Sequence, residues 1–253
     1  MILLLKLLLV PTFIGLVSLS SRKWGPIVGG WLIGLPLTSG PVAFFLALEQ
    51  GNVFASAASK AIMMGIISVF TFALAYTCSA TRHQWRPSLL AGLCAYFACT
   101  LLLDSIELSL LVSFISVLGV LVVTLLLMPK VSLSKTSYRT GWWEIPARMV
   151  SATVLVFVIT GVAQSLGPQL TGLLTPFPVY ATILAVFTHR SEGGAHAIKL
   201  LRGLVAGSFT FTTFFLIISA TITNWGVGLA FGSAILISAL THTVSFQFLR
   251  RGE

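Results

Sequence analysis

The stretch GLPLTSGPV, residues 34–42, places two prolines, two glycines, a threonine and a serine in the middle of an otherwise apolar segment. Proline lacks the backbone N–H that an α-helix needs and clashes with the preceding turn. The stretch therefore predicts that a helix over residues 25–48 is broken between Pro36 and Pro41. In lipid, such a break is tolerated only where the backbone is buried in protein or lines a wet cavity. The break is thus the first candidate site of the chain.

The composition of the chain is typical of polytopic membrane proteins. Of its 253 residues, 57% are hydrophobic and only 8% are charged, and the mean hydropathy is +1.01, whereas soluble domains carry about 25% charged residues. Each helix that crosses a bilayer needs about 17–25 apolar residues. The sequence therefore predicts an all-α fold of nine transmembrane helices, over residues 2–20, 25–48, 58–78, 87–103, 108–128, 145–165, 167–188, 199–222 and 227–248.

Positive charges lie mainly in the segments that would connect the spans on one side of the membrane. These charges are Arg22, Lys23, Arg82, Arg86, Lys130, Lys135, Arg139, Arg190, Lys199, Arg202, Arg250 and Arg251. Because Lys and Arg accumulate in cytoplasmic loops, this side is predicted to be cytoplasmic, with the N-terminus outside and the C-terminus inside. The net charge of +9 is then a topology signal, and no nucleic-acid partner is expected.

An internal repeat relates the two halves of the chain at an offset of 142 residues. Residues 24–51 align without a gap on residues 166–193, and the aligned pairs include Gly25 with Gly167, Pro26 with Pro168, Gly30 with Gly172, Pro36 with Pro178 and Gly51 with Gly193. Shared glycines and prolines indicate shared backbone geometry. The repeat predicts two four-helix units, residues 1–103 and 144–253, joined over 104–143 by a linking transmembrane helix and a basic cytoplasmic loop.

The number of spans between the units predicts their relative orientation. The first unit begins at span one and the second at span six, so an odd number of spans separates them and they cross the membrane in opposite directions. Such a 4+1+4 inverted-topology repeat, with span two broken at residues 36–41 and span seven at 175–178, is typical of secondary transporters. The broken helices would meet at the midplane, where freed backbone groups and half-helix N-termini bind a solute. The alternative is that proline and glycine only kink these helices for packing.

Three sets of residues are functional candidates. Substrate contact is predicted at the two breaks, by Pro36, Thr38, Ser39, Gly40, Pro41, Thr175, Pro176, Pro178 and Tyr180. Carboxylates in or near a membrane are candidates for proton coupling, and here they are Glu49, Glu192, Asp104 and Glu107. Lys6 and Arg148 are equivalent in the repeat and are expected to extend to the membrane surface. The alternative is a paired role at the two gates, which makes them gating candidates.

The remaining polar residues predict no enzyme, metal site or cofactor. His189, His196 and His242 are expected at the cytoplasmic face as ordinary interfacial residues, the alternative being that they act as a pH sensor. Hydroxyl residues such as Thr210 line a cavity or, more commonly, donate to carbonyls of their own helix. The three cysteines have no metal-binding spacing, and no catalytic motif is present in the sequence.

Residues 171–207 carry a more specific pattern. A G-L-x-x-P-F-P stretch at 172–178 is followed by a Ser-Glu-x-Gly turn at 191–194 and by a basic-ended helix start near Arg202. This pattern resembles the GlpM family of small four-span bacterial membrane proteins. The resemblance implies a bacterial inner-membrane protein with a link to exopolysaccharide production. The chain departs from that family in being a fused, inverted pair.

Together these patterns favour a secondary transporter that works by alternating access. Without charges in the middle of the spans, a small neutral, zwitterionic, singly charged or amphiphilic solute fits better than a polyanion. The alternatives are a non-transporting membrane subunit of envelope-polysaccharide assembly, and a channel or lipid scramblase. The expected partners are the lipid bilayer and a small-molecule or lipid-like substrate, and homo-oligomer formation is left open.

Overall fold

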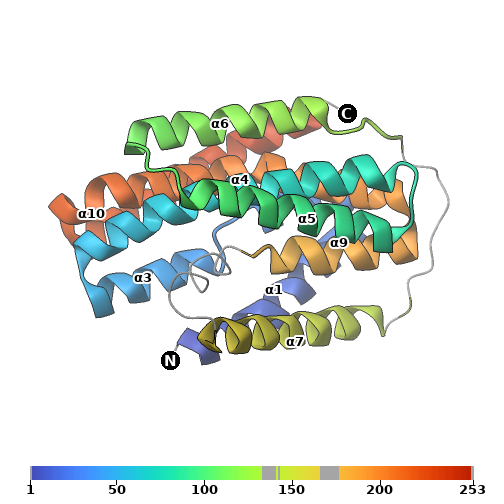
Figure 1. Ribbon diagram of the computed structural model, residues 1–253, viewed down its shortest axis with the longest axis horizontal. Helices are drawn as coiled ribbons and strands as arrows, with labels where there is room; N and C mark the ends of the chain where they lie inside the picture. Colours follow the sequence, from blue (N-terminus) through green and yellow to red (C-terminus); the bar gives the residue numbers. More distant parts are fainter. Residues whose placement is uncertain (1, 133–140, 142, 166–176, 252–253) are drawn as a thin grey trace.

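The computed structural model describes residues 2–132, 141, 143–165 and 177–251, and the described elements are all α-helices (Figure 1). For residues 2–7, 159–165, 246 and 248–251 it describes only the backbone. The helices are α1 (Ile2–Trp24), α2 (Pro26–Ile33), α3 (Ser39–Gln50), α4 (Asn52–Ala80), α5 (Trp85–Asp104), α6 (Leu110–Leu127), α7 (Glu144–Ser165), α9 (Val179–Glu192) and α10 (Gly194–Arg251). They form a bundle with α6 on one flank and α1 with α7 on the other (Figure 1).

The predicted break in span two is present. α2 ends at Ile33 and α3 begins at Ser39, because a proline between them lacks an N–H and restricts the residue before it. Turn hydrogen bonds replace helical ones in the link; for example, the N–H of Leu37 donates to the carbonyl of Leu35 at 2.8 Å. A break in span two is thus confirmed, but it lies at residues 34–38 and not at the predicted 36–41. Pro41 falls in the first turn of α3, where the backbone N–H groups have no helical partner in any case.

In the second unit, the structure describes the half-helix that follows the predicted break. α9 begins at Val179, directly after Pro178, whereas Thr175 and Pro176 lie outside the described residues. In Figure 1, α3 and α9 extend in opposite directions from the middle of the molecule. Both described half-helices therefore start inside the bundle and run toward its ends.

Four glycines form one-residue turns between consecutive helices. Gly25, Gly51, Gly193 and Gly226 all have φ between 75° and 94° and ψ between 163° and 173°, a region that is essentially restricted to glycine. Gly51 and Gly193 are equivalent in the repeat, and their φ values are 84° and 90° with ψ 169° in both. The repeat thus extends to this backbone conformation.

Gly226 divides α10 into two helices, which we call α10a (194–225) and α10b (227–251). The two parts fold back on each other, since Thr210 of α10a contacts His242 of α10b. The division falls at the boundary predicted between spans eight and nine.

Helices at equivalent positions of the repeat pack antiparallel. Ser56, near the start of α4, exchanges hydrogen bonds of 2.7 and 3.0 Å with Ser219, near the end of α10a. At the other end of this pair, Gly194 lies against the carbonyl of Ala80. The end of α1 likewise meets the start of α7. We name the two ends of the bundle the Gly51 end and the Gly193 end, after the turns found there.

The backbones of α2 and α10a are in direct contact. Gly30 of α2 and the C-cap residue Gly34 lie against the backbone of α10a, and Gly203 and Gly207 of α10a lie against the backbone of α2. A Cβ atom on either Gly30 or Gly207 would overlap backbone atoms of the other helix. Small residues spaced by four let transmembrane helices approach this closely. The contact fixes α2, and with it the start of the broken segment, against α10a.

Four described helices are long and apolar enough to cross a membrane by length and composition, namely α4, α5, α6 and α10. α5 and α6 begin and end within two residues of the predicted spans 87–103 and 108–128. Their outer faces carry exposed leucines such as Leu102 and Leu126, as surfaces in contact with lipid do. The structure is therefore that of a helical protein suited to a membrane.

Candidate functional site

The starts of α3 and α9 form the first candidate site. Thr38 is the N-cap of α3 and Tyr180 lies in the first turn of α9, and the side chains of these two repeat-equivalent residues lie near each other. The Tyr180 hydroxyl is buried but makes no hydrogen bond of regular geometry in the described part of the chain, and neither does the buried hydroxyl of Thr182. Helix N-termini carry a partial positive charge. The site therefore offers hydroxyl groups and two helix N-termini to a polar group.

The other predicted substrate residues lie close to this point in the chain. Pro36 is in the link, Ser39, Gly40 and Pro41 begin α3, and Pro178 is the N-cap of α9. They are half-buried or buried. Thr175 and Pro176, being outside the described residues, stay untested, and binding by the whole set stays a prediction.

Aromatic side chains pack between this site and the Gly51 end. Gly40, in the first turn of α3, leaves room for the ring of Phe214, which a Cβ atom would approach to 3.3 Å. Phe44 of α3 and Phe214 of α10a both pack edge-on against Phe231 of α10b, with ring centroids 5.2 and 6.1 Å apart. Apolar contacts between α3, α10a and α10b thus cover the break on this side.

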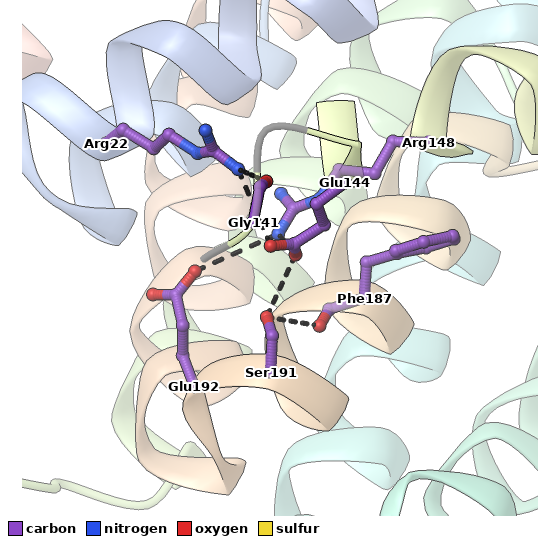
Figure 2. A network of polar contacts seen from close by, with 7 residues as sticks. All are labelled: Arg22, Gly141, Glu144, Arg148, Phe187, Ser191 and Glu192. Atoms are coloured by element: carbon purple, nitrogen blue, oxygen red, sulfur yellow. Dashed lines mark hydrogen bonds and ion pairs between the residues drawn. The ribbon is translucent and has the colours of Figure 1, made fainter. Parts of the chain in front are cut away.

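A buried ion-pair network occupies the Gly193 end (Figure 2). Glu144, the first residue of α7, accepts hydrogen bonds from Arg148 at 2.5 Å and from Ser191 of α9 at 2.9 Å. Its other carboxylate oxygen lies 3.5 Å from the guanidinium of Arg22 in α1. Glu144 and Arg148 are each only 3% exposed, and buried charges of this kind need partners. Glu144 therefore joins three helices.

Arg148 also faces a second carboxylate, that of Glu192 at the end of α9, at 3.8 Å (Figure 2). Burial raises the pKa of Glu192 above its usual range; the positive charges of Arg148, His196 and Arg22 oppose this shift, and the charge of Glu144 adds to it. The Nε atom of Arg148 is buried without a partner among the described residues. The guanidinium is thus shared between two carboxylates, and burial favours the protonated form of one of them, Glu192.

The sequence prediction found two members of this network and missed its centre. Arg148 and Glu192, predicted as gating and coupling candidates, are brought together. The expectation that Arg148 extends to the membrane surface is wrong, because its partners hold the guanidinium inside the protein. Glu144 was not among the predicted residues, and its signal in the sequence is the four-residue spacing from Arg148.

The other predicted charges lie apart from the network. Glu49 is the last residue but one of α3, while Asp104 and Glu107 lie at the link between α5 and α6. All three are exposed and make no ion pair in the described part of the chain. The side chain of Lys6 is not among those described. Coupling and gating by these residues stay predictions.

His242 lies well inside the bundle and not at the cytoplasmic face, where the sequence predicts it. Its Nδ1 atom lies 2.8 Å from the hydroxyl of Thr210, and its ring stacks on Trp31 with centroids 3.5 Å apart. The prediction was wrong because α10b continues to Arg251, so that His242 is about two and a half turns from the helix end. Thr210 contacts this ring, unlike Thr212, whose hydroxyl donates to a carbonyl of its own helix.

Cysteines and metal-binding side chains form no cluster in the described residues. Cys78, Cys94 and Cys99 are free, and no group of three or more His, Cys, Asp and Glu side chains is suitably placed for a metal ion there.

Comparison of the chain with protein-family models, with curated proteins and with solved structures finds no match. The resemblance to the GlpM family, and what it implies, therefore stays a prediction.

Proposed function

We propose that the chain is a secondary transporter that binds a small or amphiphilic solute at the midplane, between the starts of α3 and α9. The observation that carries the proposal is the meeting of Thr38 and Tyr180 at two half-helix N-termini. An unbroken transmembrane helix satisfies its backbone groups internally. A break inside the bundle leaves backbone groups that must find other partners, in the protein or in a cavity. A polar solute would provide the hydrogen-bond partner that the buried Tyr180 hydroxyl lacks among the described residues.

In this proposal, two inverted four-helix units are related by a pseudo-two-fold axis between α4 and α10a. Support comes from the antiparallel packing of these equivalent helices and from their bounds, since residues 52–80 of α4 correspond to 194–222 at the repeat offset. α6 is the extra crossing that inverts the second unit. The whole makes nine spans in a bacterial inner membrane, with the Gly193 end in the cytoplasm and the N-terminus outside.

The two ends of the bundle are held by different chemistry, which suits alternating access. At the Gly193 end, the ion pair between Arg22 and Glu144 links the first unit to the second. At the Gly51 end, the links are the apolar contacts of Phe44, Phe214 and Phe231 and the uncharged hydrogen bonds between Ser56 and Ser219. Rocking of one unit against the other separates one set of contacts while the other set forms, so that the midplane site opens to one side at a time.

Single cysteines test this mechanism directly. They are introduced at Ser39 and at Tyr180, each in a chain that lacks the three native cysteines, and labelled with a small water-soluble thiol reagent from either side. Both positions are expected to react, with access from one side falling as access from the other rises. A cysteine at Ala73, which is fully buried in α4, serves as the unreactive control.

A charge variant tests the role of the ion-pair network. Arg148→Gln removes the contacts to both Glu144 and Glu192, so labelling from the Gly193 side should increase several-fold. Lys23→Gln, which changes an exposed cation outside the network, should leave labelling unchanged. Equal effects of the two substitutions would argue against gating by Arg148.

A second candidate function is favoured by the glycine contact between α2 and α10a, which is a feature of static packing. In a non-transporting subunit of envelope-polysaccharide assembly, the break serves packing alone, and neither introduced cysteine reacts from either side. A channel or lipid scramblase would instead show access from both sides at the same time.

A further inference from the structure

His242 lies at mid-length of the bundle. Its partner Thr210 is equally far along the chain from Gly194 and from Gly226, the two residues that limit α10a. Trp31, which stacks on the ring, is in the last turn of α2, directly before the break. His242 is therefore placed beside the proposed midplane site.

The charged side chains of the described helices lie toward the ends of the bundle. Lys60 donates to the carbonyl of Leu108 at the Gly51 end, and Arg202 to that of Met128 at the Gly193 end, where the ion-pair network is also found. An ionisable side chain deep inside a membrane protein is costly, and by default it is a candidate for function.

The contacts that the structure describes for His242 are with polar but uncharged side chains. Trp31 of α2 covers one face of the ring, and Thr210 of α10a meets Nδ1. Trp31 is itself held by a 3.0 Å hydrogen bond from its indole N–H to the hydroxyl of Ser245 on α10b. The Nε2 atom of His242 is buried and has no hydrogen-bond partner among the described residues.

We propose that His242 is the proton-binding site that couples transport to a proton gradient, so that the coupling ion is H⁺. This inference rests on the proposed transporter function and adds its energy source. In this proposal the coupling proton binds near the solute, at His242. The carboxylates predicted from the sequence as coupling candidates lie at the ends of the bundle and do not bind this proton.

The protonation step follows from the contacts of the ring. A neutral imidazole carries one N–H, and uptake of one proton gives an imidazolium with two N–H donors and one positive charge. The face of Trp31 stabilises this cation, but the proton on Nε2 finds no acceptor in the described arrangement. The charged ring must therefore gain water or move away from Trp31, and α2 transmits that change to the break three residues later.

The repeat indicates a single such site in each chain. The position equivalent to His242 is Thr100, and the one equivalent to Thr210 is Ser68. Thr100 donates to the carbonyl of Tyr96 at 2.9 Å, and neither hydroxyl titrates near neutral pH. One proton per transport cycle is therefore expected.

Two readouts test the proposal on the full-length protein in sealed lipid vesicles. Tryptophan emission is followed between about pH 8 and pH 4, a range that covers histidine titration; the wild type should show a one-proton change as the charged ring acts on Trp31. His242→Thr, which introduces the residue of the equivalent position, and Trp31→Phe should each abolish the change. His83→Thr, in the exposed turn between α4 and α5, is the matched control and should retain it.

The second readout is the side preference of labelling at a cysteine that replaces Ser39. It should shift several-fold across the same pH range in the wild-type background and become independent of pH with His242→Thr. His242→Gln repeats both measurements should the threonine variant fail to fold.

The outcomes separate this inference from the proposed function. Alternating labelling whose pH dependence survives the loss of His242 overturns the coupling role and leaves the transporter in place. The absence of labelling at every pH overturns the proposed transporter function. If the tryptophan emission still changes with pH in that case, His242 titrates as a structural residue, and the coupling role is overturned as well.

Discussion

At the scale of single residues, the arrangement around Arg148 links helix packing to protonation. Its guanidinium is shared between Glu144 and Glu192, and Nε has no described partner. Removing one member of a buried pair leaves an uncompensated charge, so such networks depend strongly on the protonation of each carboxyl. Glu192 is the more exposed of the two, and its pKa is raised by burial.

Glu192→Gln should make stability less dependent on pH. Because burial raises the pKa of Glu192 in the folded state, the folded protein binds this proton more tightly than the unfolded chain, and the ionised carboxyl lowers stability at neutral pH. We expect the variant to unfold a few °C higher than wild type at pH 7, and the difference to shrink as the pH falls toward about 4.

Thermal unfolding at a series of pH values measures this difference. Glu107→Gln removes an exposed carboxylate and should give no pH-dependent difference. A stabilisation by Glu192→Gln that grows on acidification would contradict the assignment.

The sequence could indicate Arg148 and Glu192, because charges beside membrane spans are few. It could not indicate that Glu144 is buried, since burial there depends on α1 and α9, which are far from it in the chain. For His242, its position near the end of the last predicted span wrongly indicated a place at the membrane surface. Its depth depends on how far α10b extends and on Trp31, more than two hundred residues earlier.

At the scale of the helices, the local sequence was sufficient to predict where several helices begin, end and break. Length and apolar composition predicted the spans now seen as α5 and α6, and prolines predicted the break after α2, because a missing N–H acts locally. The repeated glycine turns at Gly51 and Gly193 were predicted as equivalent positions, although their shared dihedral angles were not. The contact of α2 with α10a was also not predicted, since it joins distant segments.

Gly207→Ala should destabilise this contact. An added Cβ atom would overlap backbone atoms of α2 and push the two helices apart, at a cost of about 1–3 kcal/mol in the free energy of unfolding, as in other overpacked cores. Gly232→Ala on α10b is the matched control, because no atom outside its own helix turn lies near its Cβ position. That variant should be neutral or gain up to about 1 kcal/mol.

Unfolding of the purified variants in detergent measures both values. Similar stabilities for the two variants would show that α2 is not held by close backbone packing.

At the scale of the whole molecule, the halves interlock. α2 of the first half packs on α10a of the second, α1 on α7, and α4 on α10a. The repeat identified which helices are equivalent, but it could not show that equivalent helices are also neighbours, since a sequence offset carries no information on contacts. The candidate site depends on these long-range contacts, so only its chain positions were predictable.

Dividing the chain between residues 132 and 141 tests this interlocking. Neither half should accumulate as a stable protein when expressed alone, because each leaves the partner surfaces of α2 or α10a uncovered. The two halves should co-purify when expressed together with different tags, at a level close to that of the intact chain. Separate, stable halves that fail to bind each other would contradict the described packing.

The unequal lengths of α4 and α6 have a consequence for the surrounding lipid. α4 has 29 residues and α6 has 18, which correspond to about 43 Å and about 27 Å of helix, whereas the hydrocarbon core of a bilayer is about 30 Å thick. α6 matches this thickness without tilting, while α4 must tilt or protrude. Hydrophobic mismatch therefore acts on the two helices unequally. A change in the acyl-chain length of the lipid is expected to change the tilt of α4 relative to α6.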